Sequence, residues 1–318
     1  MRICTRRQQI GALRRTLPHG SIAAALSIAL GLSNVAHAQQ PGTDFSRVEI
    51  KTTALGHDAY MLEGQGGNIT VTVARDGIVL VDTEYLPLHD RIRAAIAKVS
   101  SAPIRYAIDT HFHIDHSGGN AGFAGEGAVV VAQENVRKRL VTGAAAGLTP
   151  ATPAVSGAAL PTKLYRDSLT LRLKGVTATL RHAPHAHTDG DTYVFFREPN
   201  LLATGDVVSF GRYPNIDVDH GGSIAGMIAA CGEMLALANG ATRIVPGHGP
   251  AGDRKALVDY RAMLIDARAR MAKLIKAGKS EEEAVAARPY ADDDQKFAAS
   301  GEQRDHFIRV MYRAVKAG

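Results

Sequence analysis

Three imidazoles and a carboxylate fall within six consecutive positions of this chain, at His111, His113, Asp115 and His116. Neither core packing nor solubility gives a reason for such clustering, whereas a metal ion needs several ligands at once. Imidazole nitrogen and carboxylate oxygen suit Zn²⁺, and Fe or Mn accept the same ligand types. The stretch therefore predicts a metal site, with zinc as the expected ion.

The position of this stretch indicates how one loop could serve two metal ions. Residues 105–109 are apolar enough for a buried strand, so the ligands begin where a strand ends and the chain turns toward glycines. His111 and His113 are two residues apart and can point to the same side. Asp115 and His116 follow round the turn toward a second position.

The first 38 residues predict a secretory signal that is cleaved after Ala38. They combine five arginines without an acid, an apolar run at 21–33 and a small-x-small site at 36–38. The apolar run is shorter than the ~20 residues of a spanning helix, so a cleaved signal is favoured over an anchor. We expect a periplasmic or secreted protein without stable membrane association, exported by the Sec route or, given Arg6-Arg7, the twin-arginine route.

Removal of this segment would change the charge of the chain. The formal net charge of +6 would lose five arginines and fall to about +1. No basic run with interleaved aromatic residues remains, which argues against a nucleic-acid partner and favours a small-molecule substrate. Cys231 would be the one cysteine left, in an apolar helical context that predicts a buried structural thiol.

The rest of the chain predicts an α/β fold in a single domain, 39–318, in which 251–318 is a C-terminal helical segment packed on the sheet. Amphipathic spacing predicts helices, and Ser280 with Glu283 forms a capping box. The expected strands are 48–50, 59–62, 69–73, 78–81, 105–109, 129–132, 169–173, 176–180, 193–196, 201–203 and 243–245. The expected helices are 88–100, 133–141, 223–238, one over 257–274, one opening at 280, and 304–315.

More candidate ligands lie at the carboxyl ends of later strands. His187 follows one predicted strand, Asp206 follows another, and His248 follows the last. In a layered α/β protein a site gathers at this edge of the sheet. Two loops with little regular pattern, 142–161 and 210–222, are expected to shape the substrate site, the first as a wall or lid or as a solvated spacer.

These motifs together resemble the metallo-β-lactamase-fold hydrolase superfamily. The likeness consists of an acid at Asp82 and the H-x-H-x-D-H loop from His111, followed by His187, Asp206 and His248. The resemblance implies a four-layer αββα sandwich and a hydroxyacylglutathione-hydrolase-like or lactonase-like dinuclear site. The segments 187–191 and 213–219 further resemble exported bacterial members of this superfamily.

Carried over residue by residue, the resemblance implies one zinc on His111, His113 and His187 and a second on Asp115, His116 and His248. Asp206 would bridge the two ions, and Asp82 would orient a ligand imidazole. β-Lactamases with a cysteine ligand would have cysteine in place of Asp206 and another residue, such as arginine, in place of His116. That difference argues against efficient antibiotic hydrolysis.

The implied chemistry is direct hydrolysis by a hydroxide shared between two zinc ions. Asp115 and Asp206 are the expected catalytic carboxylates, and the substrate would be an ester, thioester, lactone or β-lactam. Weak β-lactamase-like activity, a diiron or sulfur-dioxygenase type of oxidoreductase on the same fold, and a non-catalytic metal-binding protein are the alternatives. The residues expected near the ligands or the substrate are His185, Arg212, Tyr213 and His220.

Overall fold

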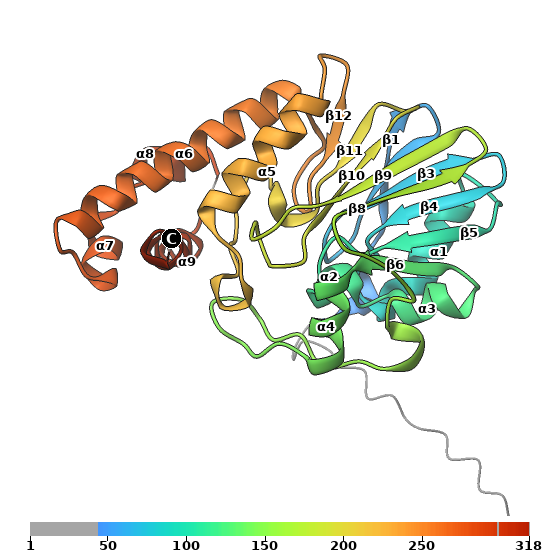
Figure 1. The fold of residues 1–318 in the computed structure, drawn as a ribbon, viewed down its shortest axis with the longest axis horizontal. Coiled ribbons are helices and arrows are strands. Elements are labelled where there is room, and N and C mark those ends of the chain that lie inside the picture. Colours follow the sequence, from blue (N-terminus) through green and yellow to red (C-terminus); the bar gives the residue numbers. More distant parts are fainter. Residues whose placement is uncertain (1–43, 298, 318) are drawn as a thin grey trace, which may run out of the picture. The chain divides into compact units, whose positions relative to one another are not determined.

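Two β-sheets face each other in the computed structural model, and helices lie on the outer face of each sheet (Figure 1). The structure describes residues 44–297 and 299–317, so the predicted signal at 1–38 lies outside the described residues. Within this range no helix is long and apolar enough to cross a membrane.

The first sheet has seven strands in chain order and changes from antiparallel to parallel pairing at β4. Its parallel half places the carboxyl ends of β4, β5 and β6 at one edge. The strands are β1 (Lys51–Gly56), β2 (Ala59–Glu63), β3 (Ile69–Ala74), β4 (Gly77–Val81), β5 (Ile104–Ile108), β6 (Val129–Gln133) and β7 (Lys163–Tyr165).

The second sheet has six strands in the order β13-β12-β11-β10-β9-β8. Here β11 and β12 are the parallel pair, so the residues that follow both strands emerge together. The strands are β8 (Ser168–Leu173), β9 (Val176–His182), β10 (Thr192–Phe196), β11 (Leu201–Ala203), β12 (Arg243–Val245) and β13 (Gly252–Asp253).

Helices connect the parallel strands and form the C-terminal part. The α-helices are α1 (His89–Ala97), α2 (Ile114–Ser117), α3 (Asn120–Gly125), α4 (Glu134–Thr142), α5 (Ile224–Leu237), α6 (Arg254–Lys276), α7 (Glu281–Ala287), α8 (Ala291–Asp294) and α9 (Gly301–Ala317). The 3-10 helices are η1 (Phe45–Arg47), η2 (Leu86–Leu88), η3 (Gly157–Ala159), η4 (Gly205–Val207) and η5 (Val218–His220).

Three apolar clusters show how the layers are held together. Ile92 and Ile96 of α1 are buried against the outer face of the first sheet, beside Leu80. Side chains such as Val79 and Val194 fill the space between the two sheets. A third cluster joins the second sheet to α5, α6 and α9, and it contains buried Cys231, as its apolar context predicted. Burial of these faces supplies the main driving force for the layered arrangement.

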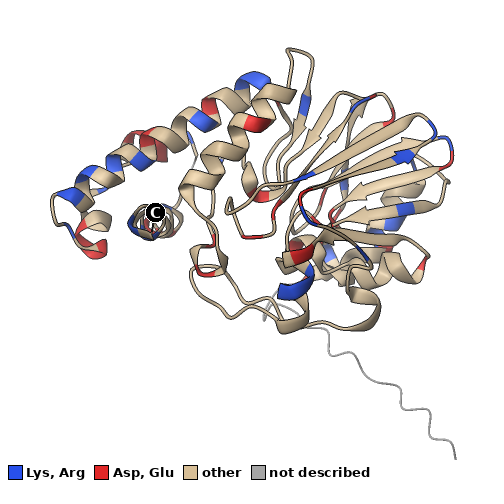
Figure 2. Ribbon diagram, in the orientation of Figure 1, with Lys and Arg blue, Asp and Glu red and all other residues tan. Residues whose placement is uncertain are grey.

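The C-terminal helices pack chiefly on α5 and on one another (Figure 1). The described residues form one compact unit by their contacts. The predicted capping box of α7 is present, with Ser280 Oγ accepting from the Glu283 backbone and the Glu283 carboxylate accepting from the Ser280 backbone. Figure 2 shows acidic positions among the basic ones along α6, which bring charges of both signs to this helix.

Most strands predicted from the sequence are present, but the first was displaced. Residues 48–50 are not a strand, because they follow η1 and pairing with β2 begins at Lys51. Two short strands, β7 and β13, were missed, since three and two residues carry too little alternation to be recognised without their partners. The loop 143–161 contains an isolated bridge between Ala144 and Thr152 and the turn η3.

Candidate metal centre

Every predicted ligand lies at the edge where the parallel strands end. β5 leads into the loop with His111 and His113, and α2 then carries Asp115 and His116. His187 follows β9, Asp206 lies in η4 directly after β11, and His248 follows β12. The donor groups that lie within 4.8 Å of one another are His111–His113–His187, His111–His116–Asp206 and Asp115–His116–His248. The structure therefore brings together residues that are widely separated in sequence.

The first group consists of three buried imidazoles. Nδ1 of His113 lies 3.0 Å from Nε2 of His111 and 3.0 Å from Nε2 of His187. Histidines 111 and 187 are fully buried, and His113 is nearly so. Burial lowers the pKa of His111 well below the ordinary histidine value and also lowers the pKa of His113, so both rings are neutral at pH 7.

Each of the three rings makes a hydrogen bond on the side that faces away from the other two rings. These bonds determine which ring nitrogen carries the proton. Nε2 of His113 donates to Asp217 Oδ2 at 2.9 Å, and Nδ1 of His187 donates to the backbone carbonyl of Asn215 at 3.0 Å. Thr110 Oγ1 donates to Asp82 Oδ2 and so accepts from Nδ1 of His111 at 3.0 Å. The three nitrogens that face one another therefore carry lone pairs and no proton.

Converging lone pairs repel unless a cation lies between them, so this group fits a metal ion. His113 would bind through Nδ1 and the other two rings through Nε2. Each ring is oriented from behind by an acceptor, which is the usual arrangement around metal-bound histidine. The donor set suits zinc and also suits iron or manganese.

The second group adds two carboxylates. Nε2 of His116 lies 3.2 Å from Asp206 Oδ1 and 3.7 Å from Asp115 Oδ2. Nε2 of His248 lies 3.3 Å from Asp115 Oδ2 and 3.5 Å from Asp206 Oδ1. Asp206 also reaches the first group, because its Oδ2 is 3.7 Å from Nε2 of His187. Its carboxylate thus lies between the two groups, as a bridging ligand would.

Electrostatics in the second group favour positive charge. Burial disfavours protonation of His116, but the carboxylates of Asp206, Asp115 and Asp82 outweigh it and hold the pKa of His116 well above its ordinary value. At His248 burial also disfavours protonation, but the carboxylates of Asp206 and Asp115 outweigh this effect and raise the pKa to about 9. Oδ1 of Asp206 is buried without a well-aligned hydrogen bond. A second metal ion fits here, because it would satisfy this oxygen and replace the protons.

Asp82 orients His116 and the backbone of Thr110 through hydrogen bonds. Its Oδ2 accepts from Nδ1 of His116 at 2.8 Å, and its Oδ1 accepts from the backbone of Thr110 at 2.8 Å. It directly follows β4 and has φ 66°, a left-handed conformation that is uncommon for a residue with a side chain. Uncommon backbone conformations of this kind cluster at functional sites.

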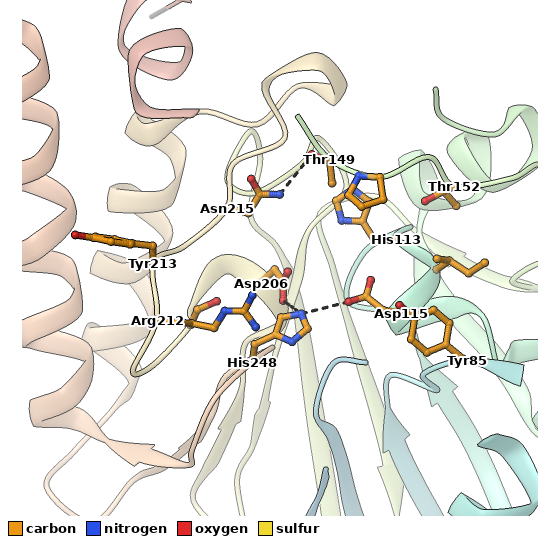
Figure 3. Close-up of a pocket in the computed structure, with 13 residues that line it drawn as sticks. Tyr85, His113, Asp115, Thr149, Thr152, Asp206, Arg212, Tyr213, Asn215 and His248 are labelled. Carbon is orange, nitrogen blue, oxygen red and sulfur yellow. Dashed lines mark hydrogen bonds and ion pairs between the residues drawn. The ribbon is translucent and has the colours of Figure 1, made fainter. Parts of the chain in front are cut away.

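A pocket opens over the second group, with a cavity volume of about 190 Å³. Figure 3 shows His113, Asp115, Asp206 and His248 at its base, with Arg212 extending toward Asp206 and His248. The loop 143–161 forms one wall through Thr149, Pro150 and Thr152. The remaining lining residues are Tyr85, Ile114, Ser209, Tyr213 and Asn215.

The residues expected near the substrate take different positions. Arg212 is exposed and lines the pocket. Tyr213 also lines it, but its hydroxyl points away from the pocket (Figure 3). This hydroxyl donates to Asp294 Oδ1 at 2.8 Å, and the ring stacks on Phe307. The ring of His220 hydrogen-bonds Asp217 at 2.8 Å, and His185 contacts the carbonyl of Gly221 at 3.1 Å. Neither of these two histidines is among the described residues that line the pocket.

Sequence reasoning missed several residues that hold the ligands. Asp217 orients His113, Thr110 orients His111, and the carbonyl of Asn215 orients His187. Asp217 is 2% exposed, and its position in the 210–222 loop gave one signal, an acid directly between the apolar residues Ile216 and Val218. A backbone acceptor such as that of Asn215 leaves no signal in a sequence.

Comparison with known proteins places these observations in a family context. Residues 62–248 match the family model described as the metallo-beta-lactamase superfamily. A linear primary-alkylsulfatase of Pseudomonas sp. is 27% identical over 231 residues, which cover 61% of this chain and 44% of that protein. The alpha subunit of a 2,4-dinitroanisole O-demethylase of Nocardioides sp. is 28% identical over 145 residues, 45% of this chain and 42% of that protein. The chain thus spans less than half the length of these curated relatives.

Solved structures share the fold at low sequence identity. A metallo-beta-lactamase from Pontibacter korlensis has a TM-score of 0.58 and 17% identity, covering 69% of this chain and all of that one. A Cronobacter sakazakii metallo-beta-lactamase has a TM-score of 0.57 and 18% identity, covering 72% of this chain and 95% of that one. The predicted α/β fold with two sheets between helical layers is confirmed.

Proposed function

Because the chain belongs to the metallo-beta-lactamase superfamily, we propose that it is a dinuclear zinc hydrolase that cleaves an ester, thioester, lactone or β-lactam. The fold and the His/Asp cluster support a metal-dependent hydrolase and suggest a site for two metal ions. We further propose that both ions are zinc, that the bond cleaved is to a carbonyl carbon, and that the nucleophile is a metal-activated water.

The position of Asp206 is the observation that carries the proposal. Its two oxygens reach histidines of both groups, with Oδ1 3.2 Å from His116 Nε2 and Oδ2 3.7 Å from His187 Nε2. A carboxylate in this position can hold two cations a few ångströms apart. Two zinc ions bound there would polarise the scissile carbonyl and activate a water as the nucleophile.

The chain's own residues would orient the reactants. Asp115 Oδ2 lines the pocket beside His248, where it can accept a proton from a water in line with the scissile bond. Burial opposes ionisation of Asp115, but His116 and His248 hold its pKa below the ordinary aspartate value, so it is a carboxylate at neutral pH. Arg212 can bind an anionic group of the substrate at the pocket mouth.

Hydrolysis of a sulfate ester is a second candidate. The similarity to a linear primary-alkylsulfatase favours it, and the Arg212 guanidinium could bind a sulfate oxygen. The same metal pair would suit this reaction, because a sulfate ester also develops negative charge on oxygen as it is cleaved. The two candidates differ in the bond that is broken and share the predicted ligands.

The test is a hydrolysis screen with the purified full chain after loading with Zn²⁺. Carboxylic esters, thioesters, lactones, β-lactams and primary alkyl sulfates would be compared, and bound metal would be measured in the same samples. We expect turnover of at least one class, loss of that turnover with a chelator, and recovery with Zn²⁺. Full activity after complete removal of metal would contradict the proposal, and oxygen consumption with bound iron would favour an oxidoreductase instead.

A further inference from the structure

A second cavity, here called the distal cavity, adjoins the pocket that is lined by the predicted metal ligands. The two share Pro150, Arg212, Tyr213 and Asn215 in their linings. The other lining residues of the distal cavity are Leu148, Pro214, Phe297, Ala299, Glu302, Gln303, His306 and Phe307. It therefore leads from the candidate metal centre toward the first turns of α9.

We infer that the substrate is elongated, with its scissile group at the metal ligands and an apolar or aromatic arm in the distal cavity. This inference rests on the proposed hydrolytic function and adds the shape and chemistry of the substrate. Residues that line the distal cavity alone would then determine specificity without taking part in the reaction.

The sizes of the cavities support an extended ligand. The pocket over the metal ligands has a volume of about 190 Å³, and the distal cavity has a volume of about 400 Å³. Small-molecule sites usually have volumes of ~300–1,000 Å³. The first pocket is too small for such a ligand by itself, whereas the two cavities joined fall within the range.

The lining of the distal cavity determines the chemistry of the arm. Leu148, Pro214, Phe297 and Phe307 present apolar or aromatic surface. Burial of a phenyl group against such surface contributes favourably through apolar area and aromatic contacts. The polar residues of the lining can accommodate a hydrogen-bonding substituent; they are Arg212, Asn215, Glu302, Gln303 and His306. Because most of the lining is apolar or aromatic, the cavity favours an arm that is largely apolar.

Hydrogen bonds across the junction set its shape. Asn215 Oδ1 lies 3.3 Å from Nε2 of His306 on α9, and Asn215 Nδ2 donates to Thr149 Oγ1 at 3.4 Å. The backbone carbonyl of Asn215 also accepts from the ring of His187. One residue therefore links α9, the loop 143–161 and a predicted metal ligand. The α9 side lies beyond residues 62–248, which match the family model, so this wall is a feature of the chain's C-terminal segment.

Two substitutions would fill the distal cavity without altering a predicted ligand. Ala299→Trp and Glu302→Trp place a large ring at positions that line the distal cavity alone. Lys316→Trp, at an exposed position near the end of α9, is the control. Bound zinc and thermal unfolding would be measured for each variant to show that the fold and the metal centre are intact.

The substrates are two series of nitrophenyl or alkyl esters that differ in length. One series lengthens the acyl group and the other lengthens the alcohol, and each runs from a methyl group to a chain ending in a phenyl ring. For the wild type we expect kcat/KM to rise by about tenfold or more along at least one series. Both cavity variants should lose that gain while retaining turnover of the short ester, and Lys316→Trp should retain both.

A binding measurement keeps the test independent of turnover. Calorimetry with 6-phenylhexanoate should show binding to the wild type and at least tenfold weaker binding to both cavity variants. If no class in the hydrolysis screen is turned over but this pattern holds, the proposed reaction fails and the cavity assignment stands. Equal kcat/KM for short and long esters, or equal binding by all variants, would overturn the inference even if hydrolysis is confirmed.

Discussion

The carboxylate of Asp217 lies 2.9 Å from Nε2 of His113, on the side of the ring opposite to the nitrogen that faces His111 and His187. Because this bond places the proton on Nε2, it leaves Nδ1 free to bind a metal. Asp217 also accepts a hydrogen bond from the ring of His220, so this one buried carboxylate links the rings of His113 and His220. This residue is a predicted determinant of metal affinity although it faces away from the metal-binding nitrogens.

Asp217→Asn should weaken Zn²⁺ binding by about 10–100-fold, the usual effect of losing a partner that orients a ligand. The amide retains the size of the side chain but is a weaker acceptor for His113. Zinc titration against a competing chelator measures the affinity. Asp219→Asn, at an exposed position in the same loop, should leave the affinity unchanged. Equal affinity in both variants would argue against an orienting role for Asp217.

Asp206→Asn should reduce the bound metal from two ions per chain to one. The amide nitrogen cannot act as a ligand, and the remaining oxygen cannot reach both groups. Metal analysis after dialysis gives the stoichiometry, and activity should fall by more than the ~10–100-fold typical of outer partners. Asp259→Asn on the exposed face of α6 is the control. Retention of two tightly bound ions in Asp206→Asn would contradict the bridging position.

Metal affinity should fall as the pH is lowered from 9 toward 6. The pKa of His248 is raised to about 9 and that of His116 lies well above its ordinary value, so both rings hold a proton at neutral pH that a metal must displace. Calorimetry at pH 7 in buffers of different ionisation enthalpy should show proton release on Zn²⁺ binding. No proton release would mean that the two rings are already neutral.

The same pKa shift predicts the stability of the metal-free chain. A histidine whose pKa is raised in the folded state stabilises the fold fully below its unfolded pKa of about 6.5, and this contribution is lost as the pH rises through about 9. Chemical denaturation of the chelator-treated protein should therefore show lower stability at pH 9.5 than at pH 6.5. Added Zn²⁺ should reduce the difference, because the bound metal replaces the protons.

Gly247→Ala should disrupt the metal centre. A Cβ at this position would overlap Asp206 Oδ1 and would also lie 2.6 Å from the backbone of Gly205. We expect at least tenfold weaker metal binding and a loss of stability. Gly125→Ala at the end of α3 is the matched control, because a Cβ there meets nothing within 4 Å. Normal zinc content in Gly247→Ala would show that the backbone around Gly247 can shift to accommodate the methyl group without loss of metal binding.

Leu264→Ala should destabilise the protein by ~2–5 kcal/mol, because Leu264 of α6 is fully buried in the cluster that joins α5, α6 and α9. Its neighbour Ile265 is 37% exposed, so Ile265→Ala should cost clearly less. Urea denaturation at a fixed zinc concentration compares the two. A similar loss in both variants would mean that α6 contributes little to the stability of the core.

Local patterns in the sequence predicted most of the elements and the residues that the structure gathers into groups able to hold a metal ion. Apolar runs with regular spacing predicted most strands and helices, and the spacing of His111, His113, Asp115 and His116 predicted metal chemistry, because ligand type and helix or strand period are properties of neighbouring residues. The short strands β7 and β13 could not be predicted, since their hydrogen-bond partners lie far away in the chain.

The tertiary structure alone decided which residues hydrogen-bond to the predicted ligands and which residues line the pocket. Asp217 and Asn215 are 104 and 28 residues from the histidines they orient, and no local pattern links such positions. Tyr213 is an expected substrate contact and lines both cavities, yet its hydroxyl is directed to Asp294, because Phe307 of α9 stacks on its ring. The sequence could determine the ligand chemistry because that depends on residue type. The protonation of each ring and the extent of the cleft depend on groups brought together by folding, and so they required the structure.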